Sequence, residues 1–392
     1  MTNESRKYDV AIAGAGPAGS SLAIRLANAG LSVLLVEQKA FPREKLCGEF
    51  ISPECLKHFS ELGVLHDISA AGGTSLKETV FFAQRGRGVA VDSAWFGGRD
   101  SLALGLSRAE MDRILLEHAR SCGVDVREET TVAGLRQDGT GGVIGVMLRG
   151  SGGRETEAAA RITIDATGRT RSLARRLDNG RTPRTAATHV AFKTHLEGAN
   201  LLPATCEIYV YRGGYGGCNL VQDGLSNLCF IVSSADAKRF GSDPERLMRE
   251  VVFTNRRAAA AMNQASAAKP WLAVPIERFG RGELVPADGM ITVGDAAAFI
   301  DPFTGSGMLL ALESAKIAAD AIVGSIVKDL GFSRLAAEYR RSYAAQFDRR
   351  LRVCSVLRHA AFVPFLAGSL ITALSLSSKL TAGVARATRS GA

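Results

Sequence analysis

Three glycines near the N-terminus have the spacing of a dinucleotide-binding turn. Gly14, Gly16 and Gly19 follow a short apolar run at residues 9–13 and open an apolar helix. Gly16 lets the backbone approach a pyrophosphate, and the free N–H groups at the helix start attract its negative charge. After a second strand-like run comes Glu37, whose carboxylate can accept hydrogen bonds from ribose hydroxyls. The unit predicts a Rossmann-type dinucleotide site and leaves FAD and NAD both open.

A second glycine-rich turn could hold the other end of such a cofactor. Gly294 and Asp295 follow a strand-like run, and a Gly-Ser-Gly turn at residues 305–307 leads into a long apolar helix from Met308 to about Val323. A carboxylate at a strand end can bind the ribityl hydroxyls of a flavin. The N–H groups at the helix start would face the negative charge of a reduced flavin ring. The alternative for this segment alone is an ordinary strand–turn–helix connection.

Together, the two segments resemble the flavoprotein superfamily of p-hydroxybenzoate hydroxylase, squalene epoxidase, flavin-dependent halogenases and geranylgeranyl reductases. The resemblance implies FAD as the cofactor. It also implies that Arg108 reaches the FAD from the first turn of a helix, where Ser107 and Glu110 form a capping box. A surface arginine is the alternative for Arg108.

The same resemblance implies a full set of cofactor contacts. The predicted cofactor-binding residues are Gly14, Gly16, Pro17, Ala18, Gly19, Glu37, Gln38, Arg43, Cys47, Gly48, Arg108, Gly294, Asp295, Pro302, Gly305, Ser306, Gly307 and Met308. No metal site is expected.

The segment from Lys45 to Gly48 is similar to the Lys-x-Cys-Gly segment of geranylgeranyl reductases, which implies that Cys47 lies close to the flavin. A cysteine there could donate a proton, if it is exposed enough, or it could simply be a small residue beside the ring. The Asp-Ala-Thr-Gly sequence at residues 165–168 is also more similar to reductases, cyclases and halogenases than to aromatic hydroxylases.

Other motifs of the geranylgeranyl reductases and the halogenases are incomplete or absent in this chain. Tyr215 matches the tyrosine of a Tyr-x-Trp-x-Phe-Pro stretch in geranylgeranyl reductases, but the rest of that stretch is missing. Tyr215 is nevertheless expected, with Cys47, as a catalytic residue. The tryptophan motif of halogenases is absent, and Lys77 is expected to be an exposed strand residue. His189 and His195 alternate with apolar neighbours, which favours partly exposed strand positions over catalytic bases.

The element pattern predicts a two-domain α/β fold. We expect a discontinuous Rossmann-type FAD-binding domain at residues 1–72, 106–184 and 286–335. Strand-like runs at residues 73–105 and 185–285 predict one antiparallel β-sheet substrate domain lying over the flavin. A C-terminal helical segment follows at residues 336–392. Its uncharged stretch from 360 to 378 is expected to close the substrate pocket, with membrane contact as the alternative.

The composition indicates the cellular compartment of the protein and excludes some classes of binding partner. The seven cysteines form no C-x-x-C pair, which argues against zinc and a disulfide framework. No signal peptide is recognisable, so a cytoplasmic protein is expected. The net charge of +9 indicates a basic surface and raises the alternative of peripheral contact with anionic lipid at the inner face of a membrane. Nucleic acid is not expected as a partner, because no basic cluster contains aromatics. The oligomeric state stays open.

These observations lead to one expected activity and its rivals. We expect reduction of a carbon–carbon double bond in a small apolar substrate that is lipid-like, isoprenoid or polyketide. The rivals are a flavin-dependent monooxygenase, then a halogenase, and, outside catalysis, a flavin-bound redox sensor. No second dinucleotide fingerprint is present, so the electron donor is NAD(P)H binding transiently or a separate reductase.

Overall fold

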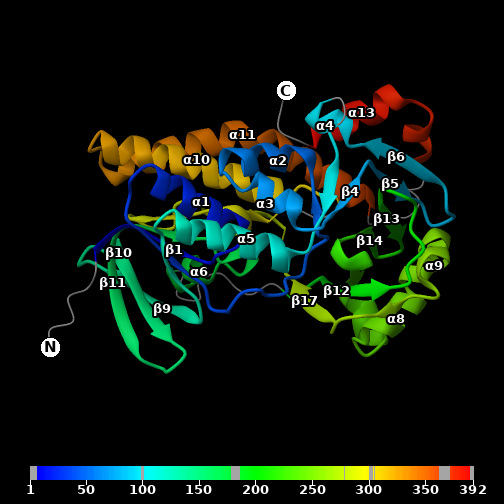
Figure 1. Cartoon of the computed structure of the whole chain (residues 1–392), viewed down its shortest axis with the longest axis horizontal. Helices are drawn as coiled ribbons and strands as arrows, with labels where there is room; N and C mark the ends of the chain where they lie inside the picture. Colours follow the sequence, from blue (N-terminus) through cyan, green and yellow to red (C-terminus); the bar gives the residue numbers. More distant parts are fainter. Residues whose placement is uncertain are drawn as a thin grey trace.

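The computed structural model describes residues 7–98, 101–177, 186–277, 279–299, 303, 305–361 and 371–388, without the side chains of 357–361 and 378. Two sheets stand side by side, and long helices lie along one of them (Figure 1). The α/β class with a Rossmann-type domain, a sheet domain and C-terminal helices is confirmed. The exact domain boundaries stay a prediction.

The first sheet builds the dinucleotide-binding half. Its central strands are parallel and its outer hairpin is antiparallel, in the order β8-β2-β1-β11-β10-β9, with β19 also paired to β11. The strands are β1 (Lys7–Ala13), β2 (Val33–Val36), β8 (Asp125–Arg127), β9 (Thr130–Gln137), β10 (Val143–Gly150), β11 (Glu155–Asp165) and β19 (Met290–Thr292). The parallel strands β1, β11 and β19 bring the ends of three distant segments to one edge, which is where such folds bind ligands.

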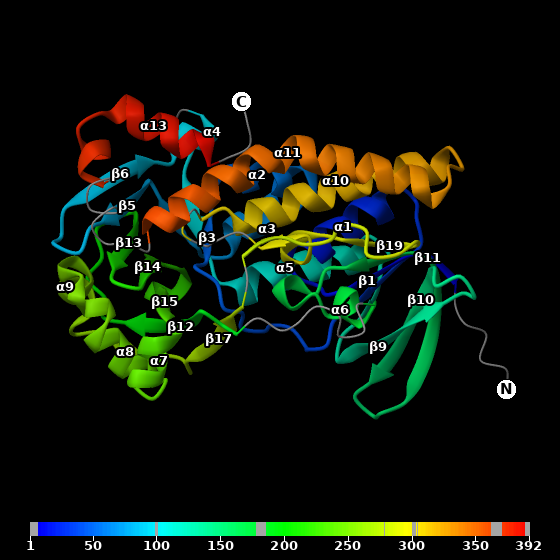
Figure 2. The same cartoon turned by 180° about the vertical axis from the view of Figure 1, so that it is seen from behind.

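Helices cover one face of this sheet and form the largest core (Figures 1 and 2). Leu22 and Leu26 from the first of them are fully buried, as the helical spacing predicts. The helices are α1 (Pro17–Asn28), α2 (Pro53–Glu61), α3 (Leu65–Ala70), α5 (Arg108–Ser121), α10 (Gly307–Val327) and α11 (Phe332–Ala361), with α6 (Ser172–Leu177) nearer the other face. The predicted capping box of α5 is confirmed in one half, because the Ser107 hydroxyl accepts a hydrogen bond from the Glu110 N–H. The other half is wrong, because the Ser107 N–H donates to Gln222 while the Glu110 carboxylate binds Arg113.

The second sheet has the order β16-β12-β15-β14-β13-β5-β6, with β17 also paired to β12. Its strands are β5 (Glu78–Phe82), β6 (Gly88–Asp92), β12 (His189–Glu197), β13 (Thr205–Tyr211), β14 (Gly214–Leu220), β15 (Ser226–Ser233), β16 (Ser266–Ala267) and β17 (Leu272–Ile276). The expectation of a wholly antiparallel sheet is wrong at one pair, since β5 and β13 run parallel. One face packs against α7 (Ser234–Arg239), α8 (Pro244–Glu250) and α9 (Arg256–Met262).

Smaller elements join the two halves. A short sheet pairs β7 (Ala103–Gly105) with β3 (Phe50–Ile51) and β4 (Thr74–Leu76), and a hairpin-like pair joins β18 (Gly280–Arg281) to β20 (Ala298–Phe299). Further helices include α4 (Ala94–Gly97), α13 (Ser378–Ala387) and the single turns η1 (Gly168–Thr170), η2 (Gln222–Gly224), η3 (Val252–Thr254) and η4 (Gly294–Ala296). Within the described ranges, no helix combines the length and the apolar character needed to cross a membrane.

The C-terminal segment divides between the two halves: α11 packs on α10 in the first core, whereas residues 371–388 lie at the second sheet. Much of the stretch expected to close the substrate pocket lies outside the described residues, at 362–370. Ile371 and Leu374, which follow it, pack with Val210 of β13 and with Phe303. The nearby helix α13 contacts α4 and β6.

We predict that Gly19→Ala lowers the free energy of unfolding by more than about 2 kcal/mol, because a Cβ at Gly19 would lie 1.9 Å from the Gly14 carbonyl oxygen. Gly150→Ala is the matched control. Its Cβ would meet nothing within 4 Å among the described atoms, so a change within about 0.5 kcal/mol is expected. Chemical denaturation of both variants measures the difference. Equal stabilities would contradict the packing assigned to the glycine turn.

Candidate active site

The glycine turn has the geometry that a pyrophosphate needs. Gly14 has a φ of +103°, and a Cβ there would lie 2.4 Å from the Ala166 carbonyl oxygen. A Cβ on Gly16 would meet only the Arg108 guanidinium, at 3.8 Å. Gly14 and Gly19 are therefore fixed by packing, whereas Gly16 leaves the backbone open beside a positive charge. Pro17 and Ala18 start α1 at this point.

Two arginines from different segments converge on one buried carboxylate. Asp112, fully buried on α5, accepts hydrogen bonds from Arg43 Nη1 at 3.0 Å and from Arg108 Nε and Nη2 at 2.9 and 2.7 Å. Arg43 also donates to Glu37 Oε2 at 3.2 Å, and the same oxygen accepts the Ala15 N–H at 3.2 Å. The sequence analysis missed Asp112. The available signal was its position four residues after Arg108 on one helix.

The Asp295 side chain is half-buried and lies among cations. Burial raises the pKa of its carboxyl to about 6, and the charges of Arg108, Arg169 and Lys45 oppose that rise. Burial, followed by the charge of Arg43, lowers the pKa of Lys45. Arg169, which sequence reasoning missed, follows the Asp-Ala-Thr-Gly sequence directly. The positive charge gathered between the glycine turn and Asp295 fits the two negative charges of a dinucleotide pyrophosphate.

The helix α10 starts at the other expected flavin contact. Gly305 has a φ of +62°, and a Cβ there would lie 3.3 Å from the Phe50 ring. Ser306 is buried, and its carbonyl accepts a hydrogen bond from Arg350 Nη2 at 3.2 Å. Arg350 also donates to Glu313 Oε2 at 2.7 Å, so α11 holds the start of α10 in place. Gly307 and Met308 begin α10, and Pro302 lies outside the described residues.

Cys47 lies beside Arg108. Burial lowers the pKa of Arg108, but Asp112 and then Cys47 raise it more, so the net shift is upward. The Glu49 N–H points at Cys47 Sγ at 3.4 Å, and Asn227 Nδ2 donates to the Cys47 carbonyl at 3.1 Å. Cys47 is half-buried, and a Cβ on the following Gly48 would meet nothing within 4 Å among the described atoms. The Cys47 backbone is therefore fixed by its hydrogen bond to Asn227, whereas the space beside the Gly48 backbone is free of other described atoms.

Tyr215 faces the same region from the second sheet. It is 4% exposed and packs in an apolar cluster with Ile231, Leu46 and Phe303. The Tyr215 and Phe303 ring centroids are 5.1 Å apart in an edge-on arrangement. The Cys47 loop therefore adjoins the Tyr215 cluster, because Leu46, which precedes Cys47 in the chain, packs against that cluster.

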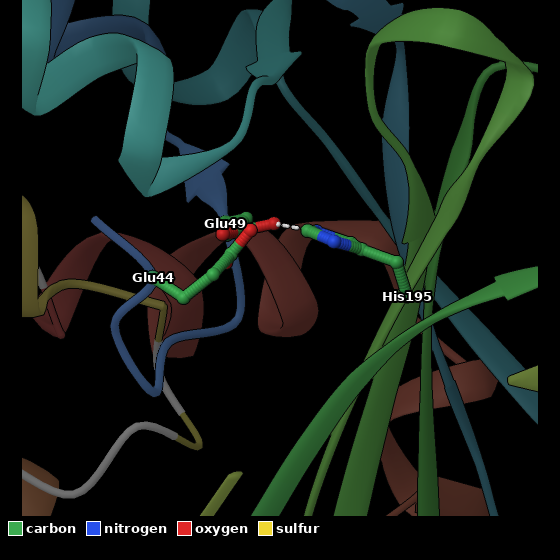
Figure 3. A group of neighbouring side chains, drawn as sticks. All are labelled: Glu44, Glu49 and His195. Atoms are coloured by element: carbon green, nitrogen blue, oxygen red, sulfur yellow. Dashed lines mark hydrogen bonds and ion pairs between the residues drawn. The ribbon is translucent and has the colours of Figure 1, made fainter. Parts of the chain in front are cut away.

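A buried ion-pair network, missed by the sequence analysis, joins the Cys47 loop to the second sheet (Figure 3). Glu49, fully buried with a φ of +53°, accepts hydrogen bonds from Lys193 Nζ at 2.7 Å and from the Arg108 N–H at 2.9 Å. Its second oxygen lies 2.6 Å from His195 Nε2. The expectation that His195 is partly exposed is wrong, because the Glu49 loop covers this face of β12. His189 is partly exposed, and Lys77 is exposed just before β5.

The outer part of this network reaches the surface. Glu44 accepts hydrogen bonds from Lys193 at 2.8 Å and from Lys269 at 2.9 Å. Burial would raise the pKa of Glu44, but the two lysines lower it to about 2. Burial would lower the pKa of Lys193, but Glu49 and Glu44 raise it. Ligand atoms of Glu44, Glu49 and His195 lie within 4.8 Å of one another, but the Lys193 ammonium is bound to both carboxylates and supplies the positive charge there.

We predict that Lys193→Met lowers the free energy of unfolding by about 3–5 kcal/mol, because it leaves the buried Glu49 carboxylate without its ammonium partner. The double variant Lys193→Met/Glu49→Gln should recover much of that loss. Lys238→Met, at an exposed position on α7, is the control and should change stability by about 0.5 kcal/mol or less. Unfolding by denaturant measures the free energies of unfolding. A Lys193 variant as stable as the control would contradict the buried ion pair of Lys193 with Glu49.

We also predict that Asp295→Asn stabilises the FAD-free protein in a pH-dependent way. The raised pKa means that the folded state favours the protonated acid, so parent stability falls as the pH rises from about 3.8 to about 6. Asparagine does not ionise, so the variant should be more stable at neutral pH, on the order of 3 kcal/mol. The difference should vanish near pH 4 in unfolding titrations. A difference independent of pH would contradict the buried-acid account.

Comparison with known proteins agrees with this geometry. Residues 7–335 match the family described as FAD binding domain. Digeranylgeranylglycerophospholipid reductase 2 of Methanothermobacter thermautotrophicus is 30% identical over 370 residues, covering 90% of this chain and 88% of the relative. The 1H-pyrrole-2-carbonyl-(peptidyl-carrier protein) chlorinase of Pseudomonas fluorescens is 28% identical over 372 residues, covering 83% of this chain and 78% of the relative. The solved structure of a myxobacterial chondrochloren halogenase has a TM-score of 0.78 at 25% identity and covers 91% of this chain and 82% of its own.

The family match spans the glycine turn, the arginine pair, Asp295 and the second sheet. The chain therefore belongs to the FAD-binding domain family and is an FAD-dependent oxidoreductase similar to geranylgeranyl reductases.

Proposed function

We propose that the enzyme reduces a carbon–carbon double bond in an apolar substrate that is lipid-like, isoprenoid or polyketide. The observation that carries this proposal is the apolar cluster of Tyr215, Ile231 and Phe303 beside the Cys47 loop. An apolar lining suits a hydrocarbon chain and excludes water. The similarity to digeranylgeranylglycerophospholipid reductases supports the same substrate class.

The protein's own groups would hold the cofactor and supply a proton. Glu37, Arg43 and Arg108 would hold the adenosine and pyrophosphate end, and Asp295 the ribityl chain. Bound and reduced FAD supplies a hydride for one carbon of the double bond. The other carbon then needs a proton, which the Cys47 thiol would supply, with the Tyr215 hydroxyl and water as the alternatives. NAD(P)H or a separate reductase would provide the two electrons that reduce the flavin.

The start of α10 would support this chemistry electrostatically. The N–H groups at Gly307 and Met308 have no partners within the helix, and the helix dipole is positive at this end. They would stabilise negative charge on a reduced flavin ring if the ring lies there. Arg350 fixes this helix end through the Ser306 carbonyl, so its role would be positioning.

Halogenation is the second candidate, because a chlorinase and a halogenase structure resemble the chain about as closely as the reductases do. Against it, Lys77 is exposed before β5, and the two tryptophans, Trp95 and Trp271, belong to different segments. Monooxygenation is a third candidate, since it needs only a dry pocket over the flavin.

We predict that Cys47→Ala slows anaerobic oxidation of the reduced enzyme by an unsaturated isoprenoid lipid about a hundredfold, because it removes the proton donor. Cys122→Ala is the matched control, since Cys122 is also half-buried but lies at the end of α5. FAD content and dithionite reduction should be equal in both variants. Flavin absorbance in an anaerobic stopped-flow instrument gives the rates. A Cys47 variant as fast as the control would assign the proton to Tyr215 or water instead.

A further inference from the structure

Positive charge is concentrated at the C-terminal end of the chain. No acidic residue follows Asp348, whereas seven basic residues do: Arg349, Arg350, Arg352, Arg358, Lys379, Arg386 and Arg389. These seven account for most of the net charge of +9. Among those whose side chains the structure describes, Arg350 is buried against Glu313, whereas Lys379 and Arg386 on α13 are exposed.

Exposed apolar side chains accompany these charges. Leu376, just before α13, is 82% exposed, and Leu380 is 50% exposed. Lys379, Leu380, Gly383 and Arg386 recur at the spacing of one helical face, and all are exposed. Thr381, from the opposite side of α13, is buried. The exposed side of α13 is therefore amphipathic, with leucines and cations together.

A tryptophan lies next to the same cations. The Trp95 side chain of α4 lines a surface hollow together with Lys379, Gly383 and Arg386. Tryptophan beside basic residues is typical of proteins at the boundary between lipid headgroups and acyl chains. We call Trp95, Leu376, Lys379, Leu380, Gly383 and Arg386 the α13 surface.

The α13 surface adjoins the apolar cluster of Tyr215, Ile231 and Phe303. Ile371 and Leu374, in the segment that leads into α13, pack with Phe81 of β5 and with Phe303. Phe303 in turn contacts the Tyr215 ring. Apolar side chains therefore continue from the exposed leucines to the apolar cluster beside the Cys47 loop.

We propose that the α13 surface binds the surface of an anionic lipid bilayer. Leu376 and Leu380 enter the boundary of headgroups and acyl chains, Trp95 lies at the headgroup level, and Lys379 and Arg386 pair with lipid phosphates. Charge complementarity identifies this occupant, because the surface combines cations with apolar groups and the chain from Arg349 onward carries no acid. The contact goes beyond the proposed reaction and does not depend on it.

The test is co-sedimentation of the FAD-loaded protein with vesicles. We expect binding to vesicles of phosphatidylcholine with phosphatidylglycerol, weak binding to phosphatidylcholine alone, and release at high salt. Lys379→Glu/Arg386→Glu should weaken binding at least about thirtyfold, since each of the two basic charges near the surface contributes about 1 kcal/mol and its reversal adds repulsion. Leu376→Ser/Leu380→Ser should weaken binding to the same vesicles while leaving its salt dependence.

The matched control reverses two exposed charges elsewhere. Arg154 lies in the turn between β10 and β11, and Lys238 lies on α7, both away from α13 (Figures 1 and 2). Arg154→Glu/Lys238→Glu should bind like the parent. Equal losses in both charge-reversed variants, or equal binding of the parent to neutral and anionic vesicles, would overturn the proposal. Binding is measured without turnover, so the result is independent of the reaction.

Discussion

The arrangement of Arg43 and Arg108 around the buried Asp112 carboxylate is the constraint on which the cofactor site depends. Each guanidinium has fixed donor positions, so two of them on one carboxylate hold three segments in register: the loop after β2, the start of α5 and, through Glu37, the glycine turn. The negative charge of Asp112 also offsets the repulsion between the two guanidinium groups. Arg108 also lies close to Asp295, together with Arg169 and Lys45, and these cations favour an anionic ligand there.

The second constraint joins the two sheets. Glu49 reaches Lys193 and His195 on β12 and the backbone of Arg108 on α5. A buried carboxylate with these partners can take only one position, which in turn fixes the Cys47 backbone next to it. In this way the second sheet positions the residue that is proposed to deliver the proton. The contacts of Glu49 would thus contribute both to the stability of the fold and to the position of Cys47 in the proposed reaction.

Local patterns in the sequence identified the parts of the site that depend on backbone conformation. Gly14 and Gly19 are required by contacts within one strand–turn–helix unit, and the cap of α5 lies within four residues. The partners of Glu49 are 144 and 146 residues away along the chain, so alternation on β12 could not reveal that a loop covers His195. The sequence analysis also missed the parallel pairing of β5 with β13, because a long connection separates these two strands along the chain. Asp112 could have been noted from its spacing to Arg108.

The most direct test of the central claim is the identity of the product. FAD-loaded enzyme would be incubated with a reductant and an unsaturated isoprenoid lipid in the presence of both oxygen and halide, and the products analysed by mass spectrometry. The account predicts a lipid that has gained two hydrogens at a double bond and has incorporated neither oxygen nor halogen. A product carrying an oxygen or a halogen atom would contradict the account and assign the enzyme to the monooxygenases or the halogenases.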